Sequence, residues 1–295
     1  MIHAHTAYGL TFHLSFPCPI LPLATADAKP DVTVVEGPVP RQLAAPVAQD
    51  QNWQAEPGRF LFRAGRHVGR FLVERGRKIT LERNPGADEE ALGFHFLDSV
   101  LAAALRQNGL LVLHANSIAT QRGALAVSGE SGAGKSTTTA ALLRRGCALL
   151  ADDLTVLRAG PEGRVEVLPG MPQFCLCEDA AGRFGQDITG LSRHRRSSKK
   201  FIVPARAAMA NSPVSLHALY LLRTYPGHDV RVRRLRGAEK FDAVQEAIYG
   251  PVLPQEHPAQ FSLLAALTQL VAVFRLERPE QRWTVEAVAE AMLGG

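Results

Sequence analysis

The sequence has no long apolar run, few cysteines and few aromatic residues. No stretch reaches the roughly 18 apolar residues that a membrane-spanning helix needs, so we expect no membrane segment. The first residues lack a basic stretch followed by an apolar run, and we therefore expect no signal peptide. The 4 cysteines show no metal-ligand spacing and no easy disulfide pairing, which indicates reduced thiols in a cytoplasmic protein.

The composition itself is that of a globular protein. With 295 residues, 46% of them hydrophobic and 21% charged, the chain can bury a sizeable core and is long enough for two domains. The net charge of +5 favours an acidic partner, a condition that ATP or an acidic peptide meets as well as nucleic acid does. No helix-turn-helix or aromatic-basic platform is visible, so we expect no nucleic-acid partner.

Hydrophobic periodicity divides the chain at about residue 90. Residues 1–90 form a β-rich region, because short alternating runs at 10–14, 31–35, 60–62, 68–73 and 78–83 are separated by Gly and Pro clusters. His3 and His5 could bind a metal, but we expect them to lie in a loose N-terminus. Residues 91–295 form an α/β domain, with helices expected at 88–108, 239–248, 260–276 and 284–292.

The chain is organised around residues 129–136, which read Gly-Glu-Ser-Gly-Ala-Gly-Lys-Ser. This is a complete G-x-x-x-x-G-K-[ST] motif, placed between the apolar run 124–127 and a helix-like segment. Glycines let backbone amides close around phosphates, the lysine adds a charge, and the serine hydroxyl can ligate Mg²⁺. We therefore expect a nucleotide-binding loop and helix start made of Gly129, Glu130, Ser131, Gly132, Ala133, Gly134, Lys135, Ser136 and Thr137.

A buried strand at 147–151 ends in the pair Asp152 and Asp153. In a parallel α/β sheet, ligands bind at the carboxyl ends of the strands, so these acids would lie near the phosphates. One carboxylate could hold Mg²⁺, usually through water, and a second could take a proton from an attacking hydroxyl. The simpler interpretation of the pair is a polar strand end.

Two further features have open interpretations. His114 follows a predicted strand at 110–113 and is either structural or part of the nucleotide site. Residues 192–200 contain six basic side chains and no acid, a pattern typical of a solvated loop or of a mobile flap that clamps an anion.

These motifs resemble those of the bacterial HPr kinase/phosphorylase family over residues 110–158. The likeness comprises the run 113–116 (Leu-His-Ala-Asn), the loop 126–136 and the run 145–153 with its terminal Ala-Asp-Asp. It implies a P-loop kinase core similar to the HPr kinase C-terminal domain. His114 and Lys135 would then contact phosphates, Ser136 would ligate Mg²⁺, Asp152 would support the metal or its water, and Asp153 would be the catalytic base. The chain departs from the family at Thr137, where the family has glutamate.

The general layout is more similar to HPr kinase-like proteins linked to lasso and other ribosomal peptides. We accordingly expect an ATP- and Mg²⁺-dependent kinase that phosphorylates a serine of a protein or precursor peptide. The resemblance also implies a homo-oligomer. Two alternatives stay open: a small-molecule kinase, and a non-catalytic nucleotide-dependent switch.

Overall fold

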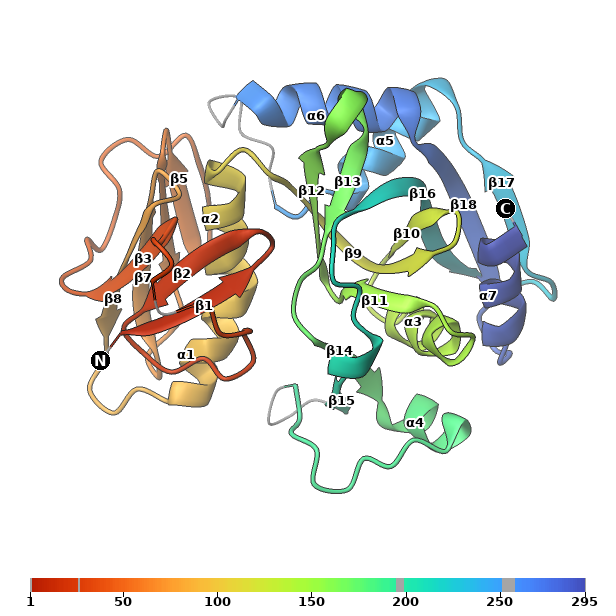
Figure 1. The fold of residues 1–295 in the computed structure, drawn as a ribbon, viewed down its shortest axis with the longest axis horizontal. Coiled ribbons are helices and arrows are strands. Elements are labelled where there is room, and N and C mark those ends of the chain that lie inside the picture. Colours follow the sequence, from red (N-terminus) through yellow and green to blue (C-terminus); the bar gives the residue numbers. More distant parts are fainter. Residues whose placement is uncertain (1, 26, 195–198, 251–257, 295) are drawn as a thin grey trace. The chain divides into compact units, whose positions relative to one another are not determined.

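The computed structural model describes residues 2–25, 27–194, 199–250 and 258–294 (Figure 1). It divides the chain into two compact units. The first contains Met1–Val112 and Gly250–Ser262, and the second contains Leu113–Tyr249 and Leu263–Gly295. The sequence pattern places the change of character at about residue 90, whereas the structure also gives the following helical segment to the first unit. Among the described residues, no helix is both long enough and apolar enough to cross a bilayer.

The first unit is built on an eight-stranded sheet in the order β1-β2-β3-β8-β7-β6-β5-β4. Its strands are β1 (His3–Ala7), β2 (Leu10–Leu14), β3 (Val32–Glu36), β4 (Ala48–Asp50), β5 (Trp53–Glu56), β6 (Arg59–Arg63), β7 (Gly69–Glu74) and β8 (Lys78–Arg83). The strands predicted from alternating patterns are therefore present. The loose N-terminus is wrong: His3 and His5 lie in β1, which pairs with β2, and His5 is buried with Nδ1 3.1 Å from the carbonyl oxygen of Leu21.

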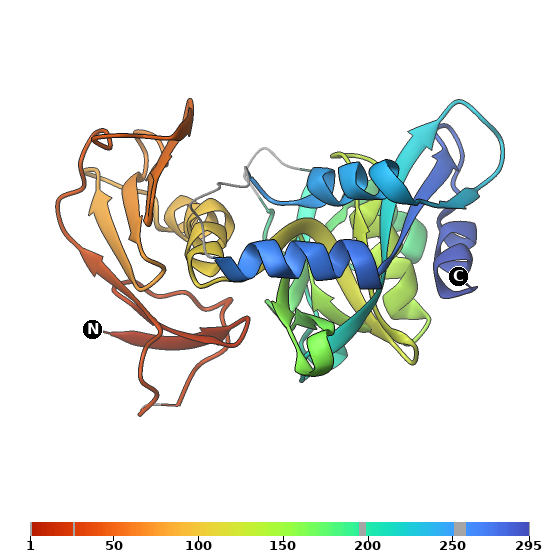
Figure 2. The same cartoon turned by 90° about the horizontal axis from the view of Figure 1, so that it is seen from above.

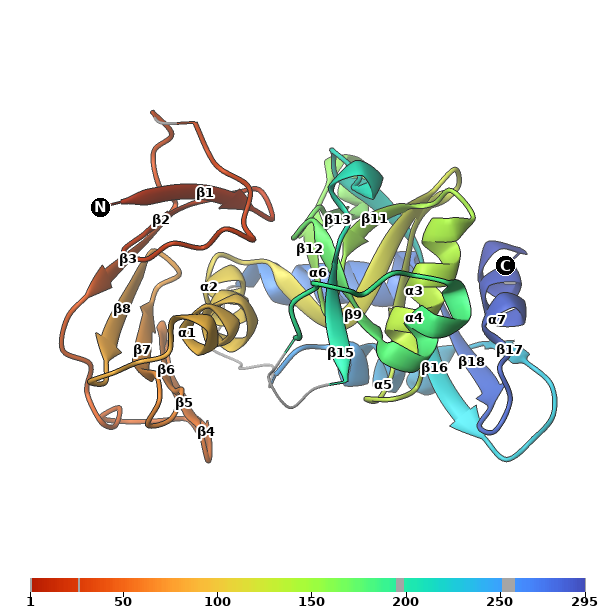
Figure 3. The same ribbon diagram turned by 90° about the horizontal axis from the view of Figure 1, so that it is seen from below.

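A helical segment covers one face of this sheet (Figure 3). It consists of α1 (Glu89–His95), η1 (Phe96–Val100), which is a π-helical stretch, and α2 (Leu101–Gln107). The side chain of Asp88 caps its start by accepting hydrogen bonds from two backbone N–H groups. Its apolar residues Leu92, Phe96 and Leu105 are fully buried, so the helix closes the core of the first unit.

The second unit contains the glycine-rich motif and the acid pair. Its strands are β9 (Leu111–Thr120), which begins in the first unit, β10 (Gly123–Ser128), β11 (Ala148–Ala151), β12 (Leu154–Ala159), β13 (Val165–Leu168), β14 (Gln173–Cys177), β15 (Lys200–Pro204), β16 (Val214–Tyr225), β17 (Arg231–Arg234) and β18 (Ala272–Pro279). Its helices are α3 (Lys135–Arg144), α4 (Glu178–Phe184), α5 (Gly237–Ala247), α6 (Pro258–Leu270), whose first residues belong to the first unit, and α7 (Val285–Gly294), with short 3-10 turns η2 (Pro161–Gly163) and η3 (Arg206–Ala208).

The main sheet of the second unit is mixed, with the order β10-β9-β12-β13-β16-β18-β17 and an additional pairing of β10 with β16. Strands β10, β16 and β18 are mutually parallel, whereas β9 runs antiparallel to β10 and β11 runs antiparallel to β9. The second unit is therefore of the expected α/β class, with both parallel and antiparallel pairs in one sheet. However, β10 and β11 flank β9 and run in the same direction, so both end at the same edge.

Helices cover both faces of the parallel strands. On one face, α3 and α7 pack against β10, β16 and β18 through a shared cluster that includes Leu142, Tyr220 and Met292. Helix α5 and the part of α6 from Leu263 onward lie on the opposite side (Figures 2 and 3). The predicted helix 260–276 is wrong at its end, because α6 stops at Leu270 and residues 272–279 form β18. Val273 is buried in β18, and its β-branched side chain favours the strand that pairs with β16.

Candidate active site

A glycine-rich loop, residues 129–134, connects the end of β10 to the start of α3. Gly129 has φ 151°, and a Cβ atom there would lie 2.3 Å from the carbonyl oxygen of Leu222 in β16. Gly134 has φ 111° and precedes the first residue of α3. Only glycine fits these two positions, so the spacing of the motif is a requirement of the backbone. Ser136 and Thr137 follow in the first turn of α3, where Ser136 is buried.

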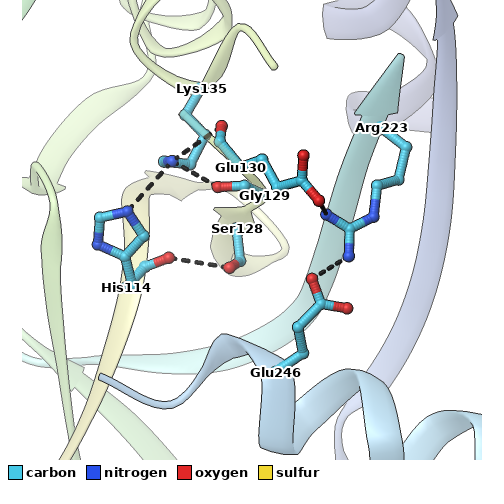
Figure 4. A network of polar contacts seen from close by, with 7 residues as sticks. All are labelled: His114, Ser128, Gly129, Glu130, Lys135, Arg223 and Glu246. Atoms are coloured by element: carbon cyan, nitrogen blue, oxygen red, sulfur yellow. Dashed lines mark hydrogen bonds and ion pairs between the residues drawn. The ribbon is translucent and has the colours of Figure 1, made fainter. Parts of the chain in front are cut away.

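Lys135 is the first residue of α3, and its side chain folds back onto the loop (Figure 4). Its Nζ donates to the carbonyl oxygen of Gly129 at 2.6 Å and to that of Glu130 at 3.4 Å, and it lies 3.3 Å from Nε2 of His114. These acceptors are backbone carbonyls and a ring nitrogen. A phosphate oxygen would be a stronger acceptor for the ammonium than any of them, because it carries a negative charge whereas these acceptors are neutral.

The ammonium of Lys135 lies within the electrostatic field of the acid pair. Burial lowers the pKa of Lys135, the negative charge of Asp153 opposes this fall, the positive charge of Lys200 adds to it, and Asp152 opposes it again. The loop lysine, the acid pair and a lysine of the basic segment therefore belong to one electrostatic site, although they come from well-separated positions in the sequence.

His114 lies within β9 and not just past a strand end, so the predicted strand boundary is wrong. Strand β9 continues to Thr120 because residues 115–120 pair antiparallel with β10 and complete a hairpin. The carbonyl oxygen of His114 accepts a hydrogen bond from the Ser128 hydroxyl at 2.8 Å. The centroid of the His114 ring lies 6.0 Å from that of the Tyr249 ring. The structure thus brings the imidazole to the Lys135 ammonium.

Two arginines from the carboxyl-terminal halves of β16 and β18 reach the loop. Arg223 contacts the Glu130 carboxylate at 3.4 Å and also pairs with Glu246 of α5 (Figure 4). Arg278 donates through Nε to the carbonyl oxygen of Ala133 at 2.6 Å, and burial lowers its pKa. Because Arg278 also reaches the next carbonyl upstream, at 3.4 Å, it braces the backbone that precedes α3.

The acid pair follows β11, and the buried residue Asn116 of β9 connects it to α3. The Asn116 Nδ2 group donates to Oδ1 of Asp152 at 2.5 Å and to the Thr139 hydroxyl oxygen at 3.0 Å. Its Oδ1 accepts from the backbone N–H of Asp153 at 3.1 Å. The Thr139 hydroxyl in turn donates to the carbonyl oxygen of Lys135 at 3.1 Å. One asparagine therefore fixes both acids relative to the first turn of the loop helix.

Asp152 is a buried carboxyl group in an unfavourable setting for its charge. Burial raises the pKa of Asp152 from 3.8 to about 7, and the negative charge of Asp153 adds to the rise. The backbone N–H of Cys175, which donates to Asp152 Oδ2 at 2.7 Å, opposes the rise, and so does the ammonium of Lys200. A cation next to Asp152 would favour its ionised form.

Asp153 adopts a backbone conformation that non-glycine residues rarely take. Its φ is 61°, and the N–H of Leu154 donates to the carbonyl oxygen of Asp152 at 2.7 Å across a three-residue turn. Such conformations cost about 1–3 kcal/mol and are found preferentially at functional sites. The surrounding hydrogen bonds of Asn116 hold this turn in place.

The oxygen donors of the site suit a hard divalent cation. The hydroxyl of Ser136 and the carboxylates of Asp152 and Asp153 are the ligand types that Mg²⁺ accepts, usually with several water molecules retained. Both Asp152 oxygens already accept one hydrogen bond, but each keeps a further lone pair for a metal-bound water. These residues therefore fit the Mg²⁺ that the sequence motif implies.

The basic segment lies partly outside the described residues, which omit 195–198. The guanidinium of Arg193 lies over the Phe201 ring at 5.1 Å from its centroid, and the N–H of His194 donates to the carbonyl oxygen of Lys200 at 2.9 Å. The segment on either side of the omitted residues is thus attached to β15. The ammonium of Lys200 lowers the pKa of Asp152, and the choice between a solvated loop and an anion-clamping flap stays open for the segment.

Sequence reasoning misses three residues of the site: Asn116, Arg278 and Lys200. Asn116 stands in the run 113–116 that carries the family resemblance, and its position two residues after His114 on a strand was the available signal. No signal near Arg278 points to a loop more than 140 residues earlier in the chain. Lys200 stands out in the sequence as part of a basic run and of a lysine pair that resembles one in the HPr kinase-like proteins, but neither pattern assigns it to the site.

No family model matches the chain, and no curated protein matches it. Among solved structures, the chain is similar to the Hpr(Ser) kinase/phosphatase from Coxiella burnetii, with 15% sequence identity and a TM-score of 0.33. The alignment covers 62% of this chain and 88% of that chain.

Proposed function

We propose that this protein is an ATP- and Mg²⁺-dependent kinase that transfers the γ-phosphoryl group to a hydroxyl, with a serine of a peptide or protein as the favoured acceptor. The observation that carries the proposal is the Asn116 network. It couples the acid pair to the helix that begins at Lys135, so that an anion-binding loop and two carboxylates share one site. A protein that only binds nucleotide has no need of the second acid.

Each group has a role in this reaction. Backbone amides of the loop, together with Lys135, hold the phosphate oxygens and stabilise the charge that develops during transfer. The acceptor hydroxyl attacks the γ-phosphorus, the bond between the γ-phosphorus and the bridging oxygen breaks, and ADP leaves. The proton of the hydroxyl passes to the carboxylate of Asp153. Mg²⁺, when bound, would neutralise charge at the phosphates, and Ser136 and Asp152 would hold it.

The assay is transfer of label from γ-labelled ATP, with Mg²⁺, to a panel of serine-containing peptides, free amino acids and sugars. We expect Asp153→Asn to lower kcat about 100-fold or more while nucleotide still binds, because a positioned base contributes about 10²–10⁴-fold. Lys135→Ala should weaken nucleotide binding. Asp187→Asn changes an exposed carboxylate that caps a neighbouring turn and serves as the control.

The acceptor panel separates the remaining possibilities. Transfer to a peptide supports the proposal, and transfer only to a free metabolite indicates a small-molecule kinase. Tight nucleotide binding without transfer to any acceptor would contradict a kinase and indicate a nucleotide-dependent switch. Light scattering of the purified chain tests the expected homo-oligomer.

A further inference from the structure

We propose that Asp153, Cys175 and His194 form a binding site for Zn²⁺ at the edge of the acid pair. One ligand atom from each of these side chains, a carboxylate oxygen, the thiol sulfur and a ring nitrogen, lies within 4.8 Å of the other two. The three residues come from the turn after β11, from β14 and from the segment before β15. Asp153 and Cys175 lie 22 positions apart in the sequence, and Cys175 and His194 lie 19 positions apart, so the cluster is a product of the fold.

The ligand chemistry favours zinc over magnesium. Zn²⁺ binds thiolate, imidazole and carboxylate in a tetrahedron, with bond lengths of about 2.0–2.3 Å, and a site with three protein ligands keeps a fourth position open. Mg²⁺ takes oxygen ligands and does not select cysteine or histidine. Ligand atoms in such a tetrahedron lie roughly 3.3–3.8 Å apart, and the three ligand atoms of this cluster all lie within 4.8 Å of one another.

Backbone hydrogen bonds hold Cys175 and His194 to the neighbouring strands. Strands β14 and β15 pair antiparallel, with Cys175 opposite Ile202. The N–H of Cys175 donates to Asp152, and the N–H of His194 donates to Lys200. Two of the ligands are thereby attached to the same two-stranded ribbon, and one of them is attached to the acid pair itself.

The thiol of Cys175 differs in charge between the metal-free and the metal-bound site. Burial and the two acids raise the pKa of the Cys175 thiol, while the positive charge of Lys200 opposes the rise. Zn²⁺ would take over the compensating role of the Lys200 ammonium, and the thiol would release its proton to solvent as the sulfur–zinc bond forms. Removal of the Lys200 charge should therefore tighten zinc binding.

Zinc at this position would occupy Asp153. If the proposed function is correct, the carboxylate that accepts the proton of the hydroxyl is then held by the metal, and phosphotransfer stops. The site would make the kinase sensitive to inhibition by zinc. This consequence depends on the proposed function, whereas metal binding itself does not.

The binding test uses the full chain and Co²⁺ as a spectroscopic substitute for Zn²⁺. We expect a thiolate-to-cobalt charge-transfer band that Zn²⁺ abolishes by displacement. Cys175→Ser should remove the band, and His194→Ala should weaken metal binding by more than the roughly 10- to 100-fold lost with an outer-shell partner. Cys147→Ser is the matched control, since this thiol lies outside the cluster and should leave the spectrum unchanged.

Lys200→Met distinguishes a metal site from general damage, because it should increase metal affinity where an unfolding variant would reduce it. The proposal is overturned if Co²⁺ gives no thiolate band, or if the band survives Cys175→Ser. In the activity assay, Zn²⁺ should inhibit the wild type at concentrations that leave His194→Ala active. A thiolate band in a protein without kinase activity would support the site and contradict the proposed function.

Discussion

Asp152→Asn removes a carboxyl group whose pKa the fold raises from 3.8 to about 7. The unfolded chain loses the proton of this residue near pH 3.8, whereas the native protein holds it to about pH 7. Between these values the native state binds more protons than the unfolded state, so the free energy of unfolding falls as the pH rises. At 1.36 kcal/mol per pH unit, the full fall amounts to about 4 kcal/mol.

In the Asp152→Asn protein, the free energy of unfolding should not show this decrease with pH. An amide keeps one acceptor for the two donors that now bind Asp152, namely Asn116 Nδ2 and the N–H of Cys175, and the lost hydrogen bond costs about 1–2 kcal/mol at every pH. The expected result is therefore a constant offset together with a flatter pH profile. Urea unfolding at a series of pH values from about 4 to 8, without added Mg²⁺, measures both quantities.

Asp153→Asn provides a second arm of the same experiment. The negative charge of Asp153 adds to the raised pKa of Asp152, so its removal should move the midpoint of the fall to lower pH. If the Asp152→Asn protein keeps the wild-type slope between about pH 5 and 7, another group titrates there and our account of the acid pair is wrong.

Three other substitutions test the remaining parts of the site. Gly129→Ala should destabilise the protein by about 3 kcal/mol or more in urea unfolding and abolish ATP binding, because the new Cβ would meet the Leu222 carbonyl oxygen at 2.3 Å; wild-type stability would contradict the described loop. Asn116→Ala removes three hydrogen bonds and should lower the free energy of unfolding by about 2–4 kcal/mol. It should also lower kcat more than it raises KM, and an unchanged kcat would show that the two aspartates are held in place without Asn116. Arg278→Ala should weaken ATP binding about 10-fold in calorimetry with little change in kcat, because the arginine contacts only backbone carbonyls there. If ATP affinity and kcat fall equally, Arg278 takes part in the reaction itself.

The local elements of the core were predictable because each has a short-range cause. Glycine at 129 and 134 meets a backbone requirement that the motif already encodes. Gly160, Pro161 and Gly163 mark the turn between β12 and β13, since Gly and Pro favour turns. The acid pair could be placed at a strand end, since a buried apolar run of four residues precedes it.

The rest depends on long-range contacts that periodicity does not report. Residues 272–276 continue the apolar pattern of α6, and only the pairing of β18 with β16 decides that they form a strand. Strand β9 lies between β10 and β11, an order that no local pattern encodes, and it contributes Asn116 to the site. Arg278 reaches the loop because parallel pairing brings the ends of β16 and β18 to one edge.

At Asp153, the residue that would favour stability differs from the residue that the proposed reaction needs. Aspartate and asparagine both tolerate the left-handed φ of 61° at this position, but the negative charge of Asp153 repels that of its neighbour Asp152. Asparagine tolerates the same backbone and carries no charge. A laboratory selection for thermal stability alone, without selection for catalysis, should therefore enrich asparagine at this position. The selected proteins would be more stable but catalytically inactive.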